Sequence, residues 1–110
     1  MLFRSSPALS RAIKAGDTAL EALIRSRSRW LGVALANVVN VLNPELVLLG
    51  GGMMEAMGQI ILPEVRSGIE AYALKPLVKV LKVVPSKLKD NAVILGASKM
   101  ACEVLKTTKK

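Results

Sequence analysis

The sequence contains no histidine, which excludes catalytic triads and metal sites that depend on an imidazole. Its single cysteine, Cys102, excludes a disulfide within the chain and fits a reducing compartment. Aromatic residues make up only 3% of the chain, with one Phe, one Trp and one Tyr. Leu, Val, Ile, Ala and Met must therefore fill the interior, which favours closely packed helices.

The sequence also lacks a long apolar run. A membrane helix needs about 20 consecutive apolar residues, whereas Gly50, Gly51 and Gly52 interrupt one apolar stretch and three asparagines interrupt another. Residues 1–4 do not supply the apolar core of a signal peptide. We therefore expect a soluble, cytoplasmic protein without membrane contact.

The length and hydrophobic content of the chain indicate one small folded domain. The chain has 110 residues, 52% of them hydrophobic, which favours a packed core over disorder. Its 16 basic residues outnumber 8 acidic ones and give a net charge of +8, which favours polyanions or an acidic partner. Because no stacking aromatics or reading helix accompany this charge, we interpret it as a solvated basic surface.

Capping signals and apolar spacing predict two helices in the first part of the chain. Ser6 and Pro7 open a short helix that Gly16 closes. A capping box beginning at Thr18 then opens a long helix that must end before Pro44. A break near Ser28 would be compatible with the pattern. The predicted buried face of the long helix consists of Leu20, Leu23, Ile24, Leu31, Ala34, Leu35, Val38 and Leu42.

The second part of the chain alternates strands and helices. Residues 46–49 form an apolar run without alternation, typical of a strand covered on both faces. Residues 54–61 suggest a helix, Pro63 opens a further helical segment that Pro76 ends, and residues 78–84 form a β-rich run ending at Pro85. After Asp90 a last helix carries Gly96, for which we expect a tight contact. Its predicted inward residues are Val93, Ile94, Ala97, Met100, Ala101 and Val104.

These elements predict an α/β fold in the order helix, helix, strand, helix, strand, helix. A helical crossover between two strands implies parallel pairing, and open α/β sheets bind ligands at the carboxyl ends of their strands. Two strands make a thin sheet, and most of the helices would have apolar faces without a partner in this chain. We therefore expect part of the fold to be missing.

Gly50, Gly51 and Gly52 are the strongest candidate for a binding site. Glycines after a strand let the backbone approach a ligand, and a following helix start offers free N–H groups to a phosphate or nucleoside. The spacing matches neither a phosphate-binding loop ending in Gly-Lys-Ser/Thr nor the dinucleotide fingerprint. A tight turn that binds nothing is the alternative, and spacing alone favours it.

Several motifs together resemble the C-terminal signature of the ROK family of sugar kinases and repressors. They occur in the same order over nearly the whole chain, although none is specific by itself. The motifs are Gly16-Asp17, Leu31-Gly32, Ala36-Asn37-Val38-Val39-Asn40, Asn43-Pro44-Glu45, residues 46–52, Leu62-Pro63, residues 82–86 and Asp90-Asn91-Ala92-Val93-Ile94-Leu95-Gly96-Ala97.

The resemblance implies an actin-like, ribonuclease-H-type ATPase fold in which ATP, with Mg, and a hexose bind between two domains. Residues 1–110 would be a single partial domain, the C-terminal segment of that fold. Gly50, Gly51 and Gly52 would lie near the adenosine and phosphates of ATP and supply half of the site. In a repressor, DNA would be bound by a winged helix that precedes the fold, so this segment itself would not contact nucleic acid.

The resemblance also implies which parts are lacking. The phosphate loop, the catalytic Asn-Asp pair, the sugar-binding Glu and His residues and the zinc motif of the family all lie upstream of the matched segment. We therefore predict that this segment contains no catalytic and no metal-binding residue and is inactive alone. Its partner would be the missing N-terminal domain or a second copy in a homo-oligomer. The sugar, and the choice between kinase and repressor, would depend on those upstream parts.

Two other interpretations stay open. The chain could be a complete oligomerisation module, or a basic binding module, with no enzymatic activity. The remaining candidate groups are predicted to be structural: Cys102 as a buried or interfacial thiol, and Met53, Met54 and Met57 as packing residues beside the glycine turn. The carboxylates are expected to cap helices or lie on the surface.

Overall fold

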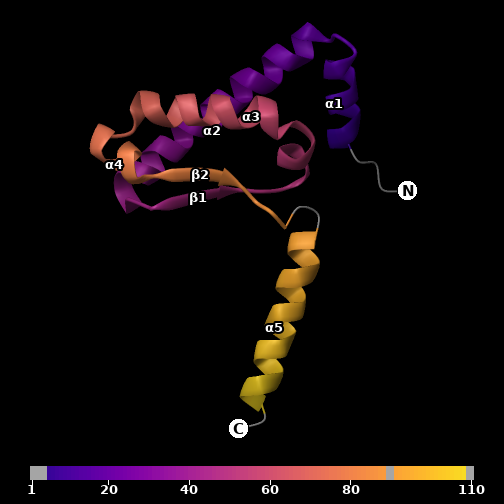
Figure 1. The fold of residues 1–110 in the computed structure, drawn as a ribbon, viewed down its shortest axis with the longest axis vertical. Helices are drawn as coiled ribbons and strands as arrows, with labels where there is room; N and C mark the ends of the chain where they lie inside the picture. The colour runs from indigo at the N-terminus through magenta and orange to yellow at the C-terminus, as the bar shows by residue number, and fades with distance from the viewer. Residues whose placement is uncertain (1–4, 89–90, 109–110) are drawn as a thin grey trace.

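The computed structural model describes residues 5–88 and 91–108 and contains a helical layer packed on a small parallel sheet (Figure 1). The element order is α1 (Ser5–Lys14), α2 (Thr18–Leu42), β1 (Leu46–Leu49), α3 (Gly52–Tyr72), α4 (Lys75–Val80), β2 (Lys82–Pro85) and α5 (Ala92–Thr108). The α/β class and the crossover between two strands are as predicted, and α4 is an additional helix.

The helices α2 and α3 form the core of the fold and cross with their backbones in contact. A Cβ atom added at Gly32 of α2 would lie 2.9 Å from the Cα of Gly68 on α3 and would overlap the carbonyl of Val65. One added at Gly68 would lie 2.5 Å from the carbonyl oxygen of Arg29. Only glycine fits at either position. The fully buried side chains around this crossing include Val39, Val65 and Ile69.

The buried face of α2 differs from the predicted one. The residues that α2 buries are Ser28, Gly32, Ala36 and Val39, which are mostly small. Four of the bulky residues predicted to face inward are substantially exposed: Leu23, Leu31, Val38 and Leu42. The prediction is confirmed for Ile24 and Leu35, which pack against the core. It was wrong for the exposed four because it looked for bulky apolar residues, whereas a close helix crossing selects small ones.

The ends of α2 also correct the sequence interpretation. Asp17, rather than Thr18, caps the helix, because its carboxylate accepts a 2.9 Å hydrogen bond from the Leu20 amide. The helix does not break near Ser28, whose hydroxyl donates to the carbonyl of Ile24. The helix stops at Asn43, which adopts a left-handed conformation.

The segment after β1 consists of two helical pieces, as predicted, but they meet at a kink at Met57 and not near Pro63. Pro63 lies inside α3 and does not open a new helix, and the only non-helical backbone within α3 is at Met57. The predicted β-rich run is also shorter than expected, because its first half forms α4, with Pro76 in the first turn. Proline favours a helix start since its missing N–H is not needed there.

The sheet consists of β1 and β2, paired in parallel with Leu46 opposite Lys82 and Leu49 opposite Pro85. One face packs on the helical core through Val47, Leu49 and the buried Val83. The other face is bare, and its Leu46 and Leu48 side chains are 53% and 58% exposed. The prediction that β1 is covered on both faces is therefore wrong for this chain.

Helix α5 extends away from the rest of the chain (Figure 1), and every one of its residues is exposed. The residues predicted to face inward from this helix are therefore exposed. A Cβ atom added at Gly96 would meet no atom within 4 Å, so the predicted tight contact is not seen. Cys102 is exposed rather than buried. Asp90, the predicted helix start, lies outside the described residues. Among residues 5–88 and 91–108, no helix is long and apolar enough to cross a membrane.

Candidate functional site

The glycine turn lies where both strands end. Leu49 closes β1, Gly50 and Gly51 form the turn, and Gly52 begins α3. The parallel register carries the chain after β2 alongside the turn, and the amide of Ser86 donates a 2.6 Å hydrogen bond to the carbonyl of Leu49. The turn is therefore at the carboxyl end of the sheet, where α/β proteins place their ligands.

Gly50, Gly51 and Gly52 differ in how strongly the structure of the turn requires glycine at each position. Gly51 has φ 99° and ψ 168°, a conformation that is essentially restricted to glycine. Gly50 and Gly52 have ordinary φ values, but an added Cβ would lie 3.4 Å from Ser86 Cβ and from Ser6 Oγ, respectively. Backbone conformation therefore fixes Gly51, and close neighbours limit the size of the other two.

Two hollows flank the turn. The first, of about 260 Å³, lies between α2 and the turn; it is mostly apolar and has Arg27 among its lining residues, with Leu31 and Met53. The second, of about 230 Å³, lies toward the end of β2 and is lined in part by Glu55 and Ser86. Each is smaller than the roughly 300 Å³ at which ligand pockets usually begin. Either hollow would hold only part of a nucleotide-sized ligand.

The chemistry of the two hollows differs. Glu55 lies in the first turn of α3, where its carboxylate already complements the positive end of the helix dipole. A phosphate in the hollow beside Glu55 would meet that negative charge. The hollow beside Arg27 has mainly carbon atoms on its walls and suits an apolar group.

The methionines beside the turn were predicted to pack. Met57 is 3% exposed and Met54 packs against the core, which confirms the prediction for both. Met53 is more exposed and lines the apolar hollow instead.

Three of the described carboxylates have structural roles. Asp17 caps α2, while Glu21 and Glu64 accept hydrogen bonds from Arg25, and these two bonds raise the pKa of the Arg25 side chain above its ordinary value. Within the described ranges, no cluster of three or more His, Cys, Asp or Glu residues could hold a metal ion.

Sequence reasoning missed two residues beside the turn, Ser86 and Arg27. Ser86 could have been found from strand register, because pairing residues 46–49 with 82–85 brings the next residues together as well. Arg27 gave no such signal, since its position depends on how α2 packs over the turn.

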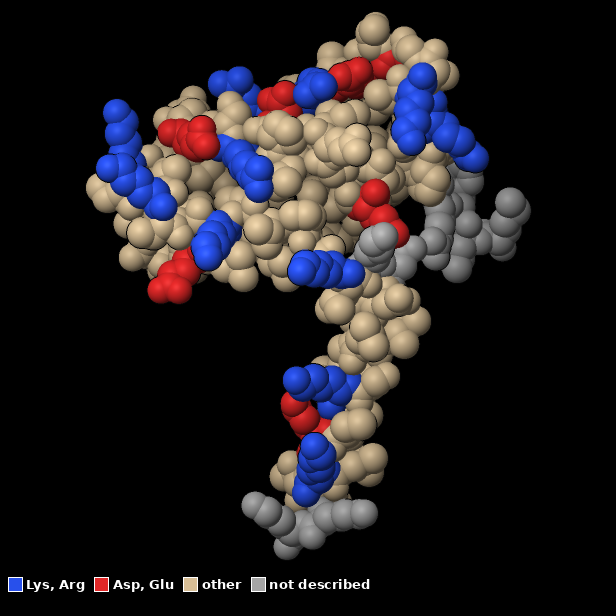
Figure 2. All heavy atoms as spheres, in the orientation of Figure 1, with Lys and Arg blue, Asp and Glu red and all other residues tan. Residues whose placement is uncertain are grey.

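The positive charge is spread over the face of the molecule that Figure 2 shows. On the face in Figure 2, Lys and Arg side chains are scattered among neutral residues and interspersed with Asp and Glu. This view shows no continuous basic patch of the kind that binds nucleic acid.

Comparison with known proteins decides the family. Residues 5–104 match the sequence model of the ROK family. The chain belongs to the ROK family. The resemblance stated from the motifs is therefore confirmed.

The relatives of this ROK chain include both repressors and kinases. It is 33% identical over 90 residues to the xylose repressor of Caldicellulosiruptor bescii, covering 82% of this chain and 22% of the repressor. It is 33% identical over 92 residues to a glucokinase of Thermotoga maritima, covering 84% of this chain and 26% of the glucokinase. The chain thus spans about a quarter of the length of these curated relatives.

Solved structures support the same family. A ROK family transcriptional regulator, a homologue of the E. coli MLC protein, matches with a TM-score of 0.63 at 32% identity, over 70% of this chain and 19% of its own. A proposed sugar kinase from Cytophaga hutchinsonii matches with a TM-score of 0.76 over 93% of this chain and 34% of its own. Because the second pair is only 20% identical, it shows a shared fold alone.

Proposed function

We propose that this chain is the C-terminal part of a ROK sugar kinase or sugar-responsive repressor with an actin-like, ribonuclease-H-type fold. In this proposal its glycine turn supplies the adenosine side of an ATP site. The observation that carries the proposal is the glycine-only conformation of Gly51 at the carboxyl end of the sheet, in a turn whose Gly50 lines a mostly apolar hollow. The relatives named glucokinase and xylose repressor support the proposal that the whole protein is either a kinase or a repressor.

The residues around the turn fit a nucleoside better than a phosphate. The apolar hollow, which Gly50 lines, could accept one face of an adenine ring. Gly51 lines the other hollow, and without a side chain it leaves the backbone of the turn open there. The Glu55 carboxylate disfavours phosphate on the other side of the turn. ATP phosphates and Mg²⁺ would therefore be held by parts of a ROK protein other than the described residues. Those parts would also supply the base that activates a sugar hydroxyl.

The chain alone is accordingly proposed to bind nucleotide weakly and to transfer no phosphate. The described carboxylates act as a cap, bond to Arg25 or lie exposed, and among residues 5–88 and 91–108 no group of three or more could hold a metal ion. The sugar would bind in the missing part, and the whole protein would work in the cytoplasm.

A nucleotide titration followed through backbone amide signals tests the proposal. We expect ATP, ADP and adenosine at millimolar concentration to shift the amides of Gly50, Gly51 and Gly52. Inorganic tripolyphosphate should leave those amides unshifted, because the proposed contact is with the nucleoside. Equal shifts with tripolyphosphate would instead indicate general attraction to the +8 charge, and no shift with any ligand would contradict nucleotide binding.

A matched pair of glycine variants provides the control. Gly51 and Gly16 both have positive φ, 99° and 102°, and at each an added Cβ would meet no atom within 4 Å. Gly51→Ala and Gly16→Ala should therefore impose similar backbone strain, about 1–3 kcal/mol. Only Gly51→Ala should weaken the nucleoside-induced shifts, since Gly16 lies in the link between α1 and α2. Equal weakening by both variants would contradict the assignment.

A further inference from the structure

The helix that follows the glycine turn is divided into a short and a long piece at Met57. Met57 has φ −137° and ψ 22°, which is not helical, so the short piece consists of residues 52–56. A kink interrupts the regular ladder of hydrogen bonds between backbone groups four residues apart, and the groups near it need other partners. The orientation of the short piece, which carries Gly52 of the turn, is therefore not fixed by the long piece alone.

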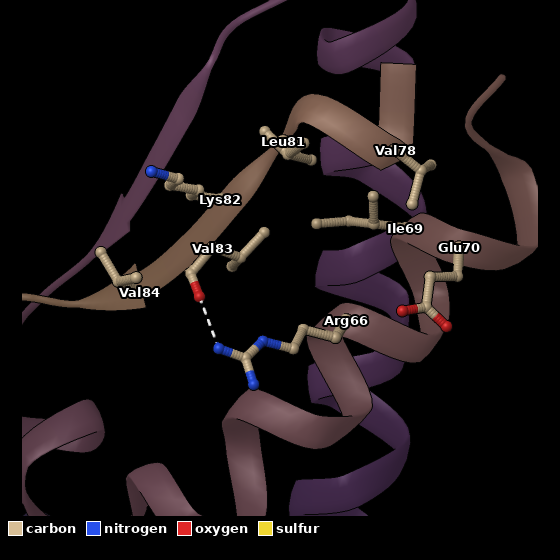
Figure 3. Close-up of a pocket in the computed structure, with 8 residues that line it drawn as sticks. All are labelled: Arg66, Ile69, Glu70, Val78, Leu81, Lys82, Val83 and Val84. Carbon is tan, nitrogen blue, oxygen red and sulfur yellow. Dashed lines mark hydrogen bonds between the residues drawn. The ribbon is translucent and has the colours of Figure 1, made fainter. Parts of the chain in front are cut away.

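The long piece of α3 is held on two sides. Gly68 packs against Gly32 of α2, where the two backbones are in contact. The guanidinium of Arg66 donates a 2.7 Å hydrogen bond to the carbonyl of Val83 on β2 (Figure 3). Because a close helix crossing and a bond to the sheet keep the long piece in place, any movement about Met57 would displace the short piece instead.

The short piece is held by α1. The hydroxyl of Ser10 donates a 3.1 Å hydrogen bond to the carbonyl of Ala56, the last residue before the kink. Ser6 lies beside Gly52, because a Cβ atom added at Gly52 would come 3.4 Å from the Ser6 Oγ. Ser6 and Ser10 are four residues apart and therefore share one face of α1. Gly52 and Ala56 have the same spacing, so α1 lies along the short piece from its first residue to its last.

The packing between α1 and the short piece is incomplete. A hollow of about 610 Å³ lies between the two helices, with Ile13 and Lys14 on one side and residues 54–60 on the other. Among the residues that the structure describes, no hydrogen bond other than that of Ser10 joins α1 to α3. The Ser10 hydroxyl is therefore the directional contact of an interface that apolar packing does not fill.

We propose that Ser10 is a positioning residue for the glycine turn. Its bond to Ala56 fixes the short piece of α3 about the kink, and the short piece fixes Gly52. The amide of Glu55 donates to the carbonyl of Gly51, so the turn and the short piece move together. What the turn binds rests on the proposed nucleoside site, whereas the position of the turn depends on Ser10 whether or not a ligand is bound.

Relaxation dispersion of backbone amides in the nucleotide-free, full 110-residue chain tests the proposal. Ser10→Ala removes the hydroxyl, and the loss of one hydrogen bond should raise the population of a displaced turn about fivefold, as measured at residues 50–56. The same variant should raise the Kd of adenosine by up to about fivefold, because only the undisplaced turn binds it. The amides of Gly32 and Gly68, beyond the kink, should show no change.

Two further variants separate the hydroxyl from the stability of α1. Ser10→Thr keeps a hydroxyl, although threonine favours a helix less than alanine does, so it should retain the wild-type dispersion and adenosine Kd. Ser6→Ala makes the alanine substitution on the same face of α1, at a position that no hydrogen bond between described residues joins to α3. It should change the dispersion less than Ser10→Ala does.

Specific results would overturn the role of Ser10. Unchanged dispersion in Ser10→Ala would do so, as would equal effects of Ser10→Ala and Ser10→Thr, or of Ser10→Ala and Ser6→Ala. Changed dispersion with an unchanged adenosine Kd would also overturn it, because binding would then not depend on the position of the turn. The nucleoside site fails separately: a wild-type chain without adenosine-induced shifts contradicts that site, while the nucleotide-free dispersion still reports on Ser10.

Discussion

Helices α3 and α5 both contain glycine among apolar residues, yet one is at the centre of the fold and the other touches nothing. At the crossing of α2 and α3, Gly32 and Gly68 bring two backbones into contact. On α5, Gly96 has open space around it and all neighbouring residues are exposed. The close contact of a helical glycine is therefore visible at Gly32 and Gly68, whose partners are both described, and no described residue contacts Gly96.

The largest effect is expected from enlarging either glycine of the α2–α3 crossing. Gly32→Ala and Gly68→Ala would each drive a methyl group into the backbone of the other helix, which cannot move away like a flexible side chain. Each should lower the free energy of unfolding by about 3 kcal/mol or more. Urea denaturation followed by circular dichroism measures this. A loss below about 1 kcal/mol would show that the helices can separate at little cost.

The sequence predicted the order of most elements because their boundaries depend on local chemistry. Pro44, Gly16 and the run of residues 46–49 each act through their own backbone or immediate neighbours. The buried face of α2 was not predictable in the same way. A stripe of Ser28, Gly32, Ala36 and Val39 looks weakly apolar until α3 lies across it.

In the candidate site, too, some features follow from the local sequence and others depend on how the helices pack. A glycine turn after a strand was predictable from residues 50–52, and so was its place at the carboxyl end of the sheet. The positions of Arg27 and Glu55, which give the two hollows different chemistry, depend on how α2 and α3 pack together. Binding at Gly50, Gly51 and Gly52 stays a prediction.

A smaller effect is expected at the far end of the α2–α3 pair. Asn40 of α2 donates a 3.2 Å hydrogen bond to the carbonyl of Tyr72 and accepts a 2.9 Å bond from the amide of Leu74. Both contacts are exposed to water, so Asn40→Ala should cost only about 1 kcal/mol of unfolding free energy. The control is Asn37→Ala, at an exposed position on the same helix. Equal losses from the two variants would mean that Asn40 does not anchor the end of α3.

The smallest effect is expected at Gly96. Substitution there should change amide exchange within α5 and not the stability of the α2–α3 core, unlike the substitutions at the crossing and at Asn40. Since alanine favours helix by about 1 kcal/mol over glycine, Gly96→Ala should slow amide exchange within α5 by roughly fivefold. The unfolding midpoint of the α2–α3 core should not change, because α5 buries no residue against it. Hydrogen exchange resolved by residue measures both quantities in one sample. A destabilised core would instead reveal a contact at Gly96 in solution, and α5 would then have to pack much as α3 does.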